Sequence, residues 1–325
     1  MPLFQRLIQR FMYLEKQRKQ AGMKRILLLI GTTLFMASIG CKQSPAPAWE
    51  GYSINKVAEE KQGMVVCAHP AASQVGTDVL KAGGNAVDAA IAVQFALAVV
   101  YPVAGNIGGG GFMVIRQADG HTDALDYREK APAAAGRDMY LDSTGAVIPG
   151  LSLNGHLASG VPGSVDGMLE AFARYSQLKD FNKLIQPAID LAEQGFHLTE
   201  RQAKNLNSAQ ESFIKYNTKK PVFVRDSAWK EGDLLIQPDL AQTLIRIRDQ
   251  GRDGFYAGKT ADLIVAEMQA GHGIITHQDL QDYHAQWRDA LVGDYRGYQV
   301  ITMPPSSSGG CIVAAFGIGG DLSPG

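Results

Sequence analysis

The glycine-rich stretch GNIGGGG at residues 105–111 constrains the fold more than any other feature of the sequence. It follows a segment, 86–100, that is apolar almost all round, and it precedes the strand-like FMVIR at 112–116. A phosphate-binding loop needs the reverse order, because the helix after the glycines must point its N-terminus at the phosphate. No Lys-Ser or Lys-Thr pair follows the glycines either. We therefore expect tight backbone packing here, or a backbone that passes close to a ligand.

Hydrophobic periodicity along the chain predicts one domain of mixed α and β structure. Asn85 is expected to cap the apolar helix 86–100, and Pro102 is expected to stop it. A buried strand is expected at 63–69 and a hairpin at 112–127. Further helices are expected from Pro70 to the glycines at 83–84 and at 164–175, 181–193, 199–213, 238–249 and 260–269, with a last hairpin-like stretch at 298–303.

The N-terminal region has the pattern of a secretory signal. A basic start at Met23, the expected true start, is followed by an apolar run at 26–40. That run is shorter than the roughly 20 residues that a membrane-spanning helix needs. Residues 38–41, SIGC, are similar to a bacterial lipobox in which Cys41 is lipidated, although Ser38 stands where a leucine is usual. An ordinary signal peptide with a free Cys41 is the alternative.

We accordingly divide the chain into a signal region at 1–40, a Pro-rich tether at 41–48, a main domain at 49–316 and a divergent tail at 317–325. A tether rich in proline would hold the domain away from a membrane surface. The protein is therefore expected to be exported, as a periplasmic or outer-membrane-anchored lipoprotein. A lipid on Cys41 would be its only contact with the membrane.

Composition and charge exclude several classes of protein. With 46% hydrophobic and 19% charged residues, the 325-residue chain is too apolar to be disordered. A net charge of −1 lacks the basic footprint that nucleic-acid binding needs. Three cysteines are too few for a disulfide scaffold, and we expect Cys67 to be a buried thiol. His272, His277 and His284 share no helical face and belong to no HExxH pattern, so we expect no metal site and no cofactor.

Charged residues follow an apolar strand in the stretch DYREKAP at 126–132. Arg128 there offers a fixed fork of donors for a carboxylate. A structural ion pair of Arg128 with Glu129 or Asp126 is the alternative. Ser164 lies in a sequence that superficially resembles a nucleophile elbow, but a proline occupies the place of the first glycine. We expect Ser164 to open the following helix instead.

Six segments, in order along residues 50–316, resemble the γ-glutamyltranspeptidases (glutathione hydrolases). They are 83–90 (GGNAVDAA), 106–113 (NIGGGGFM), 127–132 (YREKAP), 156–163 (HLASGVPG), 293–298 (GDYRGY) and 303–310 (MPPSSSGG). Each match is moderate by itself, and their shared order makes the resemblance specific.

The resemblance implies the large-subunit part of an α/β N-terminal nucleophile hydrolase, a four-layer αββα sandwich. Such proteins are zymogens that cleave themselves, and the new N-terminal threonine of the small subunit attacks the γ-glutamyl carbonyl. The γ-glutamyl group then passes to water or to an amine or peptide acceptor. The implied substrates are glutathione and other γ-glutamyl compounds, and the implied partner is the small subunit of the same precursor. Arg128 is the implied contact of the glutamyl α-carboxylate.

The chain departs from the family pattern near its end. No threonine lies in the family's Thr-Thr-His-type cleavage context, so no catalytic residue is assigned. After Phe316, the glycines at 317, 319 and 320 and a proline at 324 replace an apolar helix. We expect the chain alone to be an incomplete enzyme with open sheet edges, inactive and prone to aggregate. The alternatives are a cephalosporin-acylase-like amidase of the same fold and a non-catalytic, surface-tethered remnant.

Overall fold

The computed structural model describes residues 59–319. They belong to one compact unit, which spans 52–325. The predicted signal region, the tether, the start at Met23 and the lipidation site at Cys41 lie outside the described residues, as do the last six residues of the chain. Within 59–319, no helix combines the length and the apolar character that crossing a membrane requires.

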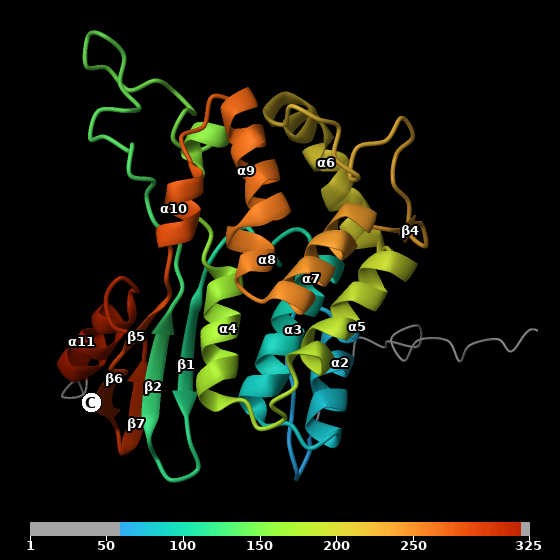
Figure 1. Ribbon diagram of the computed structural model, residues 1–325. Helices are drawn as coiled ribbons and strands as arrows, with labels where there is room; N and C mark the ends of the chain where they lie inside the picture. The colour runs from blue at the N-terminus through green and yellow to red at the C-terminus, as the bar shows by residue number, and fades with distance from the viewer. Residues whose placement is uncertain (1–58, 320–325) are drawn as a thin grey trace, which may run out of the picture. The chain divides into compact units, whose positions relative to one another are not determined.

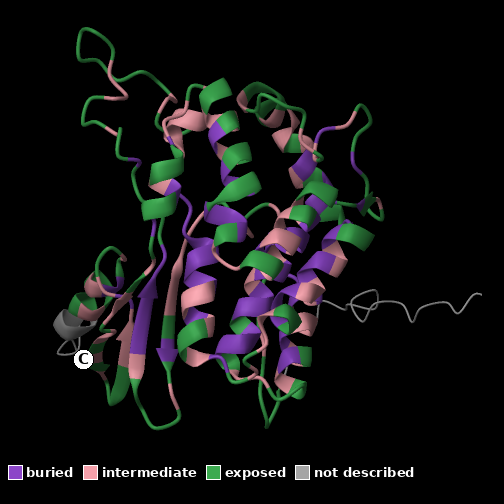
Figure 2. Ribbon diagram, in the orientation of Figure 1, coloured by how far each residue is buried: buried purple, intermediate pink, exposed green. Residues whose placement is uncertain are grey.

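A group of helices around α3 (Ala86–Val100) forms the core (Figure 1). The helices α2 (Pro70–Lys81), α4 (Ser164–Tyr175) and α5 (Phe181–Gln194) pack against α3. Figure 2 shows α3 buried along most of its length. A helix without a polar face has to be covered on every side, which agrees with the apolar sequence of α3.

The start of α3 is joined to the end of α4. Asn85 and Asp88 form a capping box, in which each side chain accepts a hydrogen bond from the backbone N–H of the other (2.9 and 3.0 Å). Asp88 also accepts from the backbone N–H groups of Gln177 and Leu178 (2.9 and 3.2 Å). The Asn85 amide donates to the carbonyl of Tyr175 (2.6 Å). These bonds pair groups that a helix end otherwise leaves unpaired.

A three-stranded antiparallel sheet lies beside the helices in the order β1 (Phe112–Arg116), β2 (Thr122–Asp126) and β5 (Gln286–Arg288) (Figure 1). Trp287 on β5 donates through Nε1 to Glu170 on α4 (3.2 Å), so α4 covers one face of the sheet. Among residues 59–319, β1 and β5 are the edges of this sheet, and Val114 on β1 is 42% exposed. Unpaired strand edges of this kind favour association with further strands.

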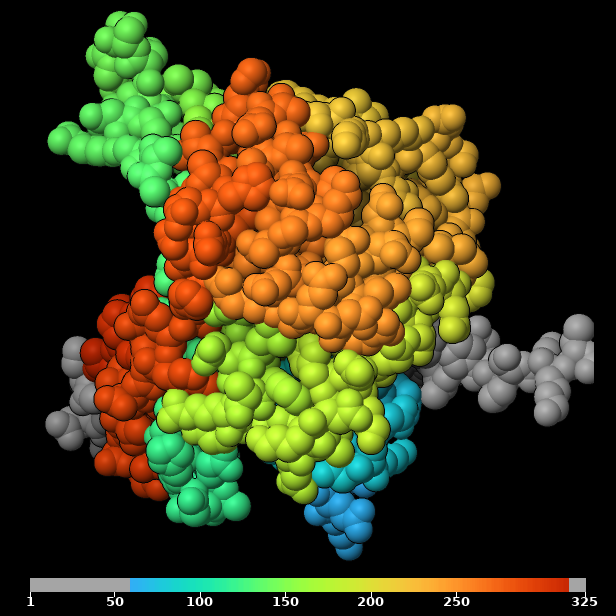
Figure 3. Space-filling model, viewed as in Figure 1, coloured from blue at the N-terminus to red at the C-terminus, as the bar shows by residue number. Residues whose placement is uncertain are grey.

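The remaining elements complete the unit. They are η1 (His156–Ala158), β3 (Phe196–His197), α6 (Glu200–Tyr216), β4 (Leu234–Leu235), α7 (Pro238–Gln250), α8 (Asp253–Tyr256), α9 (Gly258–Ala270), α10 (His277–Asp282), β6 (Leu291–Tyr295), β7 (Tyr298–Thr302) and α11 (Gly309–Gly319). β3 pairs with β4, and β6 pairs with β7, each pair as a separate two-stranded sheet. α11 packs against the sheet of β6 and β7. The segment 133–155, drawn in green, projects from the body of the unit (Figures 1 and 3).

The predicted helices and hairpins are confirmed to within three residues at each end. The buried strand predicted at 63–69 is wrong. Within the described part of the chain no strand pairs with this segment, and Val66 is 82% exposed. Apolar sequence alone does not make a strand, because a strand needs a partner for its backbone groups. The prediction that Cys67 is buried is also wrong. Cys67 lies in this unpaired segment and is half-buried, with its Sγ 3.0 Å from the hydroxyl oxygen of Ser73.

The helix α11 runs past Phe316 to Gly319 and so includes the glycines at 317 and 319. Glycine in a helix costs about 1 kcal/mol relative to alanine. The two glycines lie in the last turn of the helix, where the backbone carbonyl groups lack partners within the helix whatever the residue.

His69 caps the start of α2. Its Nδ1 accepts a hydrogen bond from the backbone N–H of Ala71 (3.2 Å), and its ring packs edge-on against Phe196 with centroids 5.8 Å apart. Burial lowers the pKa of His69 from 6.5 to about 4, since a buried ring favours the neutral form. Protonation would remove the acceptor that caps the helix. The stabilisation by His69 is therefore complete above pH 6.5 and is lost as the pH falls toward 4.

We predict that the free energy of unfolding falls more steeply between pH 6.5 and 4 in the wild-type chain than in His69→Asn. Asparagine can keep the cap but has no titrating ring. The difference should reach about 3 kcal/mol at most, because one pKa unit corresponds to about 1.4 kcal/mol. Urea unfolding midpoints across this pH range provide the measurement. The exposed His284→Asn should keep the wild-type slope, and an unchanged slope in His69→Asn would contradict the role of the cap.

Candidate functional site

The glycine-rich segment 106–113 and the charged segment 127–132 are joined through their backbones. Gly111 and Tyr127 exchange two hydrogen bonds with N–O distances of 3.3 and 3.1 Å. These bonds extend the β1–β2 ladder past the end of both strands. The residues that follow Tyr127 are thereby held against the glycine turn.

The segment 156–163 is hydrogen-bonded through its backbone to both the charged segment and the glycine turn. Lys130 and Val161 exchange hydrogen bonds of 3.2 and 2.7 Å. The backbone N–H of Gly163 donates to the carbonyl of Gly109 (2.7 Å). Three segments that are separate in the sequence therefore share one backbone network.

Tyr127 lies in a slot lined by glycines. A Cβ atom on Gly110 would lie 2.5 Å from the Tyr127 carbonyl oxygen, and one on Gly111 would lie 2.9 Å from the ring. A Cβ atom on Gly167, in α4, would overlap the ring from another direction. Only residues without a side chain allow packing as close as this. The expected tight backbone packing is confirmed, and burial raises the pKa of Tyr127 to about 12, so its phenol stays neutral.

Asn106 and Ser164 fix the glycine turn. The Oδ1 atom of Asn106 accepts hydrogen bonds from the backbone N–H of Gly109 (2.8 Å) and from the hydroxyl of Ser164 (2.9 Å). Ser164 is buried and is the first residue of α4. The structure therefore confirms that Ser164 opens a helix, and its hydroxyl is engaged in holding the turn.

Arg128 follows the buried end of β2 and is exposed. Its Nη1 donates to the carbonyl of Ser306 (3.0 Å), which brings the Pro-Pro-Ser-Ser-Ser segment to the site. Asp126 does not neutralise the guanidinium, because its Oδ2 accepts from Nε of Arg288 (2.9 Å) and its Oδ1 from the backbone N–H of Arg128 (3.2 Å). Among residues 59–319 no ion pair includes Arg128, so the alternative of an ion pair with Glu129 or Asp126 is wrong. The rest of the guanidinium is available for an anion.

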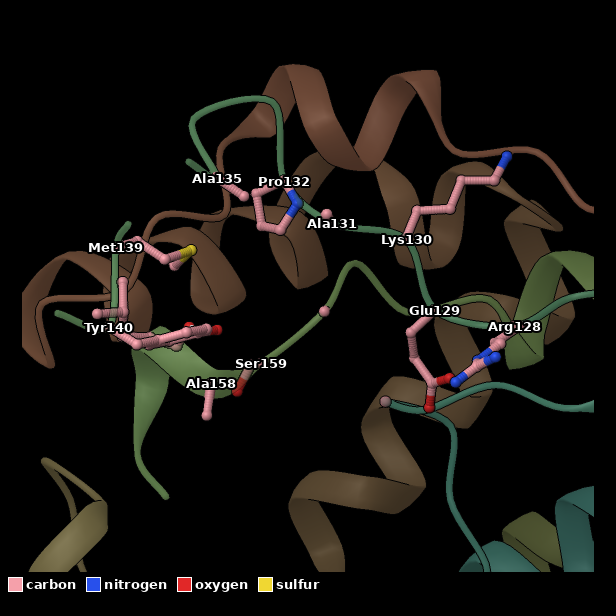
Figure 4. A pocket seen from close by; sticks show the side chains of 13 residues that line it. Arg128, Glu129, Lys130, Ala131, Pro132, Ala135, Met139, Tyr140, Ala158 and Ser159 are labelled. Atoms are coloured by element: carbon pink, nitrogen blue, oxygen red, sulfur yellow. The ribbon is translucent and has the colours of Figure 1, made fainter. Parts of the chain in front are cut away.

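A cavity of about 630 Å³ opens beside Arg128 (Figure 4). Arg128, Glu129 and Lys130 lie at one end, and Met139 and Tyr140 lie at the other. Small side chains line the space between them; they are Ala131, Pro132, Ala135, Ala158 and Ser159, with Gly108 and Gly160. A charged fork at the edge of a cavity of this size fits a small ligand that carries a carboxylate.

The wall of the cavity at 157–160 is anchored through His156. Its Nε2 lies 2.9 Å from a carboxylate oxygen of Glu267 on α9. Glu267 also accepts from the backbone N–H and the hydroxyl of Thr218 (2.9 and 2.5 Å). Burial by itself would raise the pKa of Glu267, but the hydrogen bonds from Thr218 and His156 outweigh it and lower the pKa to about 2. The carboxylate thus remains charged, and holds the wall, throughout the neutral range.

Other chemistry-bearing groups lie apart from the cavity. Within the described chain, no group of three or more His, Cys, Asp and Glu side chains is placed to hold a metal ion. Cys67 and Cys311 are free thiols. His277 pairs with Asp262 (2.9 Å) on the exposed surface.

Four of the six family-like segments meet around Arg128, and two do not. The segment 83–90 builds the cap of α3, and 293–298 forms the turn between β6 and β7. Sequence analysis missed Tyr283, whose hydroxyl donates to the carbonyl of Arg128 (2.8 Å), and the pair of the buried Asp166 with the half-buried Arg252 (2.9 Å). No local pattern marks these residues, because their partners lie 155 and 86 positions away.

Comparison with known proteins gives the relationship of the chain. The family model described as Gamma-glutamyltranspeptidase matches residues 72–321. The chain belongs to the γ-glutamyltranspeptidase family. The glutathione hydrolase proenzyme of Pseudomonas sp. (strain A14) is 50% identical over 255 residues, which cover 78% of this chain and 44% of the relative. The glutathione hydrolase proenzyme of Escherichia coli (strain K12) is 45% identical over 287 residues, which cover 88% of this chain and 49% of that relative. The chain thus spans about half the length of the curated relatives that it matches.

The family fold is also found among solved structures. The γ-glutamyltranspeptidase of Helicobacter pylori superimposes with a TM-score of 0.76 at 50% sequence identity, covering 78% of this chain and 73% of that chain. This likeness confirms the predicted fold class, the large-subunit part of an α/β N-terminal nucleophile hydrolase.

We predict that Gly167→Ala destabilises the fold, although alanine is the better helix former by about 1 kcal/mol. The added methyl group would overlap the Tyr127 ring, and overpacking a buried site costs about 1–3 kcal/mol. Urea unfolding followed by circular dichroism should show a lower midpoint.

The matched control is Gly310→Ala in α11, where the new Cβ would lie 3.9 Å from a side-chain carbon of Leu291, an ordinary van der Waals distance. Its midpoint should stay constant or rise. A rise of the same size in Gly167→Ala would show that no slot confines the ring.

Proposed function

We propose that this chain supplies the large-subunit portion of a glutathione hydrolase that cleaves γ-glutamyl amides such as glutathione. The observation that carries the proposal is the exposed guanidinium of Arg128. It lies beside a cavity of about 630 Å³, where four family-like segments meet, and forms no ion pair within residues 59–319. Charge-assisted hydrogen bonds from this guanidinium would hold the α-carboxylate of the γ-glutamyl group. The names of the relatives, glutathione hydrolase proenzymes, support this choice of substrate.

The nucleophile would come from the part of the proenzyme relatives that this chain does not match. In the proposed reaction, a threonine hydroxyl oxygen bonds to the γ-carbonyl carbon, its proton passes to the leaving amine, and the amide C–N bond breaks. Water or an amine acceptor then takes the γ-glutamyl group from the resulting ester. This chain would bind and orient the substrate, and the small subunit would also cover the sheet edges at β1 and β5.

A cephalosporin-acylase-like amidase is the second candidate. A glutaryl group retains a carboxylate that Arg128 could bind and lacks the α-amine of a glutamyl group. Arg128 alone therefore does not separate the two substrates. The relatives at 45–50% identity are named glutathione hydrolases, which favours the γ-glutamyl substrate. Rates with γ-glutamyl and glutaryl 4-nitroanilides, measured side by side, distinguish the candidates.

The main test is to co-express the chain with the second half of the Pseudomonas relative and to measure 4-nitroaniline released from γ-glutamyl-4-nitroanilide. We expect turnover from the combined halves and none from this chain alone. Arg128→Lys should lower kcat/KM by about 10- to 100-fold, because hydrogen bonds to a charged group are worth about 1.5–3 kcal/mol.

The matched control is Arg116→Lys on β1, whose exposed side chain donates to the carbonyl of Gln117 (3.5 Å) and, within residues 59–319, to no other group. It should leave kcat/KM unchanged. Folded, combined halves without turnover would favour the non-catalytic, surface-tethered remnant instead.

We also propose that the protein is exported and lipidated on Cys41, as a periplasmic or outer-membrane-anchored lipoprotein. The basic start and the apolar run at 26–40 support export, and the lipobox-like residues 38–41 support the anchor. Cells given labelled palmitate should incorporate the label into the wild type and into Cys67→Ala, and should lose it in Cys41→Ala. An unlabelled wild type would favour an ordinary signal peptide.

A further inference from the structure

Tyr283 connects the site to the core behind it. It follows α10 directly and is 1% exposed. Its hydroxyl donates to the backbone carbonyl of Arg128 (2.8 Å), and its ring stacks on that of Tyr256 with centroids 5.9 Å apart and planes 5° from parallel. Burial raises the pKa of Tyr283 above its usual value, so the hydroxyl keeps the proton that it donates.

The segment that carries Tyr283 is itself held firmly. Arg252 donates through Nε to Asp166 (2.9 Å) and through Nη2 to the carbonyl of Tyr283. The other carboxylate oxygen of Asp166 accepts from the backbone N–H of Ala285 (2.7 Å). Asp166 is buried, and breaking a buried charge pair is costly. Tyr283 therefore acts as a fixed point for the residues that contact it.

Lys130 contacts the same ring from the side of the cavity. Its Nζ lies 4.8 Å from the centroid of the Tyr283 ring and donates to the carbonyl of His284 (2.8 Å). Residues 128–130 are thus attached to 283–284 at two points. The backbone hydrogen bond to Arg128 is the one of these that acts directly on the residue beside the cavity.

We propose that Tyr283 is a positioning residue for Arg128. Among residues 59–319, the side chain of Arg128 makes one hydrogen bond, to the carbonyl of Ser306, so the direction of its guanidinium depends on where its backbone is held. The Tyr283 hydroxyl fixes that backbone and so aims the guanidinium at the carboxylate of the ligand. A bidentate hydrogen-bonded contact between a guanidinium and a carboxylate is weakened by small displacements of either group. The identity of this carboxylate, the α-carboxylate of a γ-glutamyl group, rests on the proposed function.

The test compares the dissociation constants of L-glutamate and 4-aminobutyrate for this chain combined with the second half of the Pseudomonas relative, measured by NMR titration. 4-Aminobutyrate lacks the α-carboxylate, so the ratio of the two constants reports the contact with Arg128. Tyr283→Phe removes only the hydroxyl and should reduce this ratio by about tenfold, toward the value of Arg128→Gln. A general loss of stability would weaken both ligands alike and leave the ratio unchanged.

Tyr256→Phe is the matched control. The ring of Tyr256 stacks on that of Tyr283. The Tyr256 hydroxyl donates to the carbonyl of Pro162 (2.9 Å) and accepts from the backbone N–H of Asp166 (3.2 Å), and it makes no hydrogen bond to Arg128. This variant should keep the wild-type ratio. A ratio that falls in Arg128→Gln but stays constant in Tyr283→Phe overturns the proposal.

A wild-type chain that binds both ligands equally would instead contradict the proposed function. The positioning role is then decided by amide hydrogen exchange at residues 128–130. Faster exchange in Tyr283→Phe than in Tyr256→Phe supports it, and equal exchange in the two variants overturns it.

Discussion

The site depends on the close packing of one aromatic ring against glycine backbone. Tyr127 occupies space that a side chain at Gly111 or Gly167 would fill, and its carbonyl lies where a side chain at Gly110 would reach. This packing brings the glycine turn, the end of β2 and the start of α4 to within backbone hydrogen-bond distance. A close-packed interior transmits small displacements, so the position of Arg128, one residue further on, follows from the fit of the Tyr127 ring.

Two buried carboxylates near the site pair with arginines other than Arg128, which forms no ion pair within residues 59–319. Asp126 lies only two residues before Arg128 in the sequence, yet its carboxylate is engaged by Arg288 from β5. Asp166 is likewise engaged, by Arg252. Buried acids need partners to offset the loss of water, and here the partners come from distant strands and helices. Among residues 59–319, Arg128 is thereby left without a carboxylate partner.

The helices around α3 and the sheet beside them differ in what they contribute to the structure. The helices around α3 bury the apolar surface, and the cap at Asn85 fixes where the central helix begins. The sheet and the turns beyond it bury less, and they present Arg128, the cavity and the exposed edge at β1.

The amino-acid sequence by itself determined the elements whose causes are local. The capped helix at 86–100, the hairpin at 112–127 and the role of Ser164 in opening α4 depend on neighbours a few residues away. The order of six motifs was enough to identify the family. The strand predicted at 63–69 failed because pairing depends on a partner strand, which its own residues do not specify. Only the tertiary structure decided that, within residues 59–319, Asp126 pairs with an arginine and Arg128 pairs with no carboxylate, because Arg288 and Ser306 come from positions 162 and 178 residues further along the chain. Contacts over such separations are set by how the elements pack, and no local pattern of residues records them.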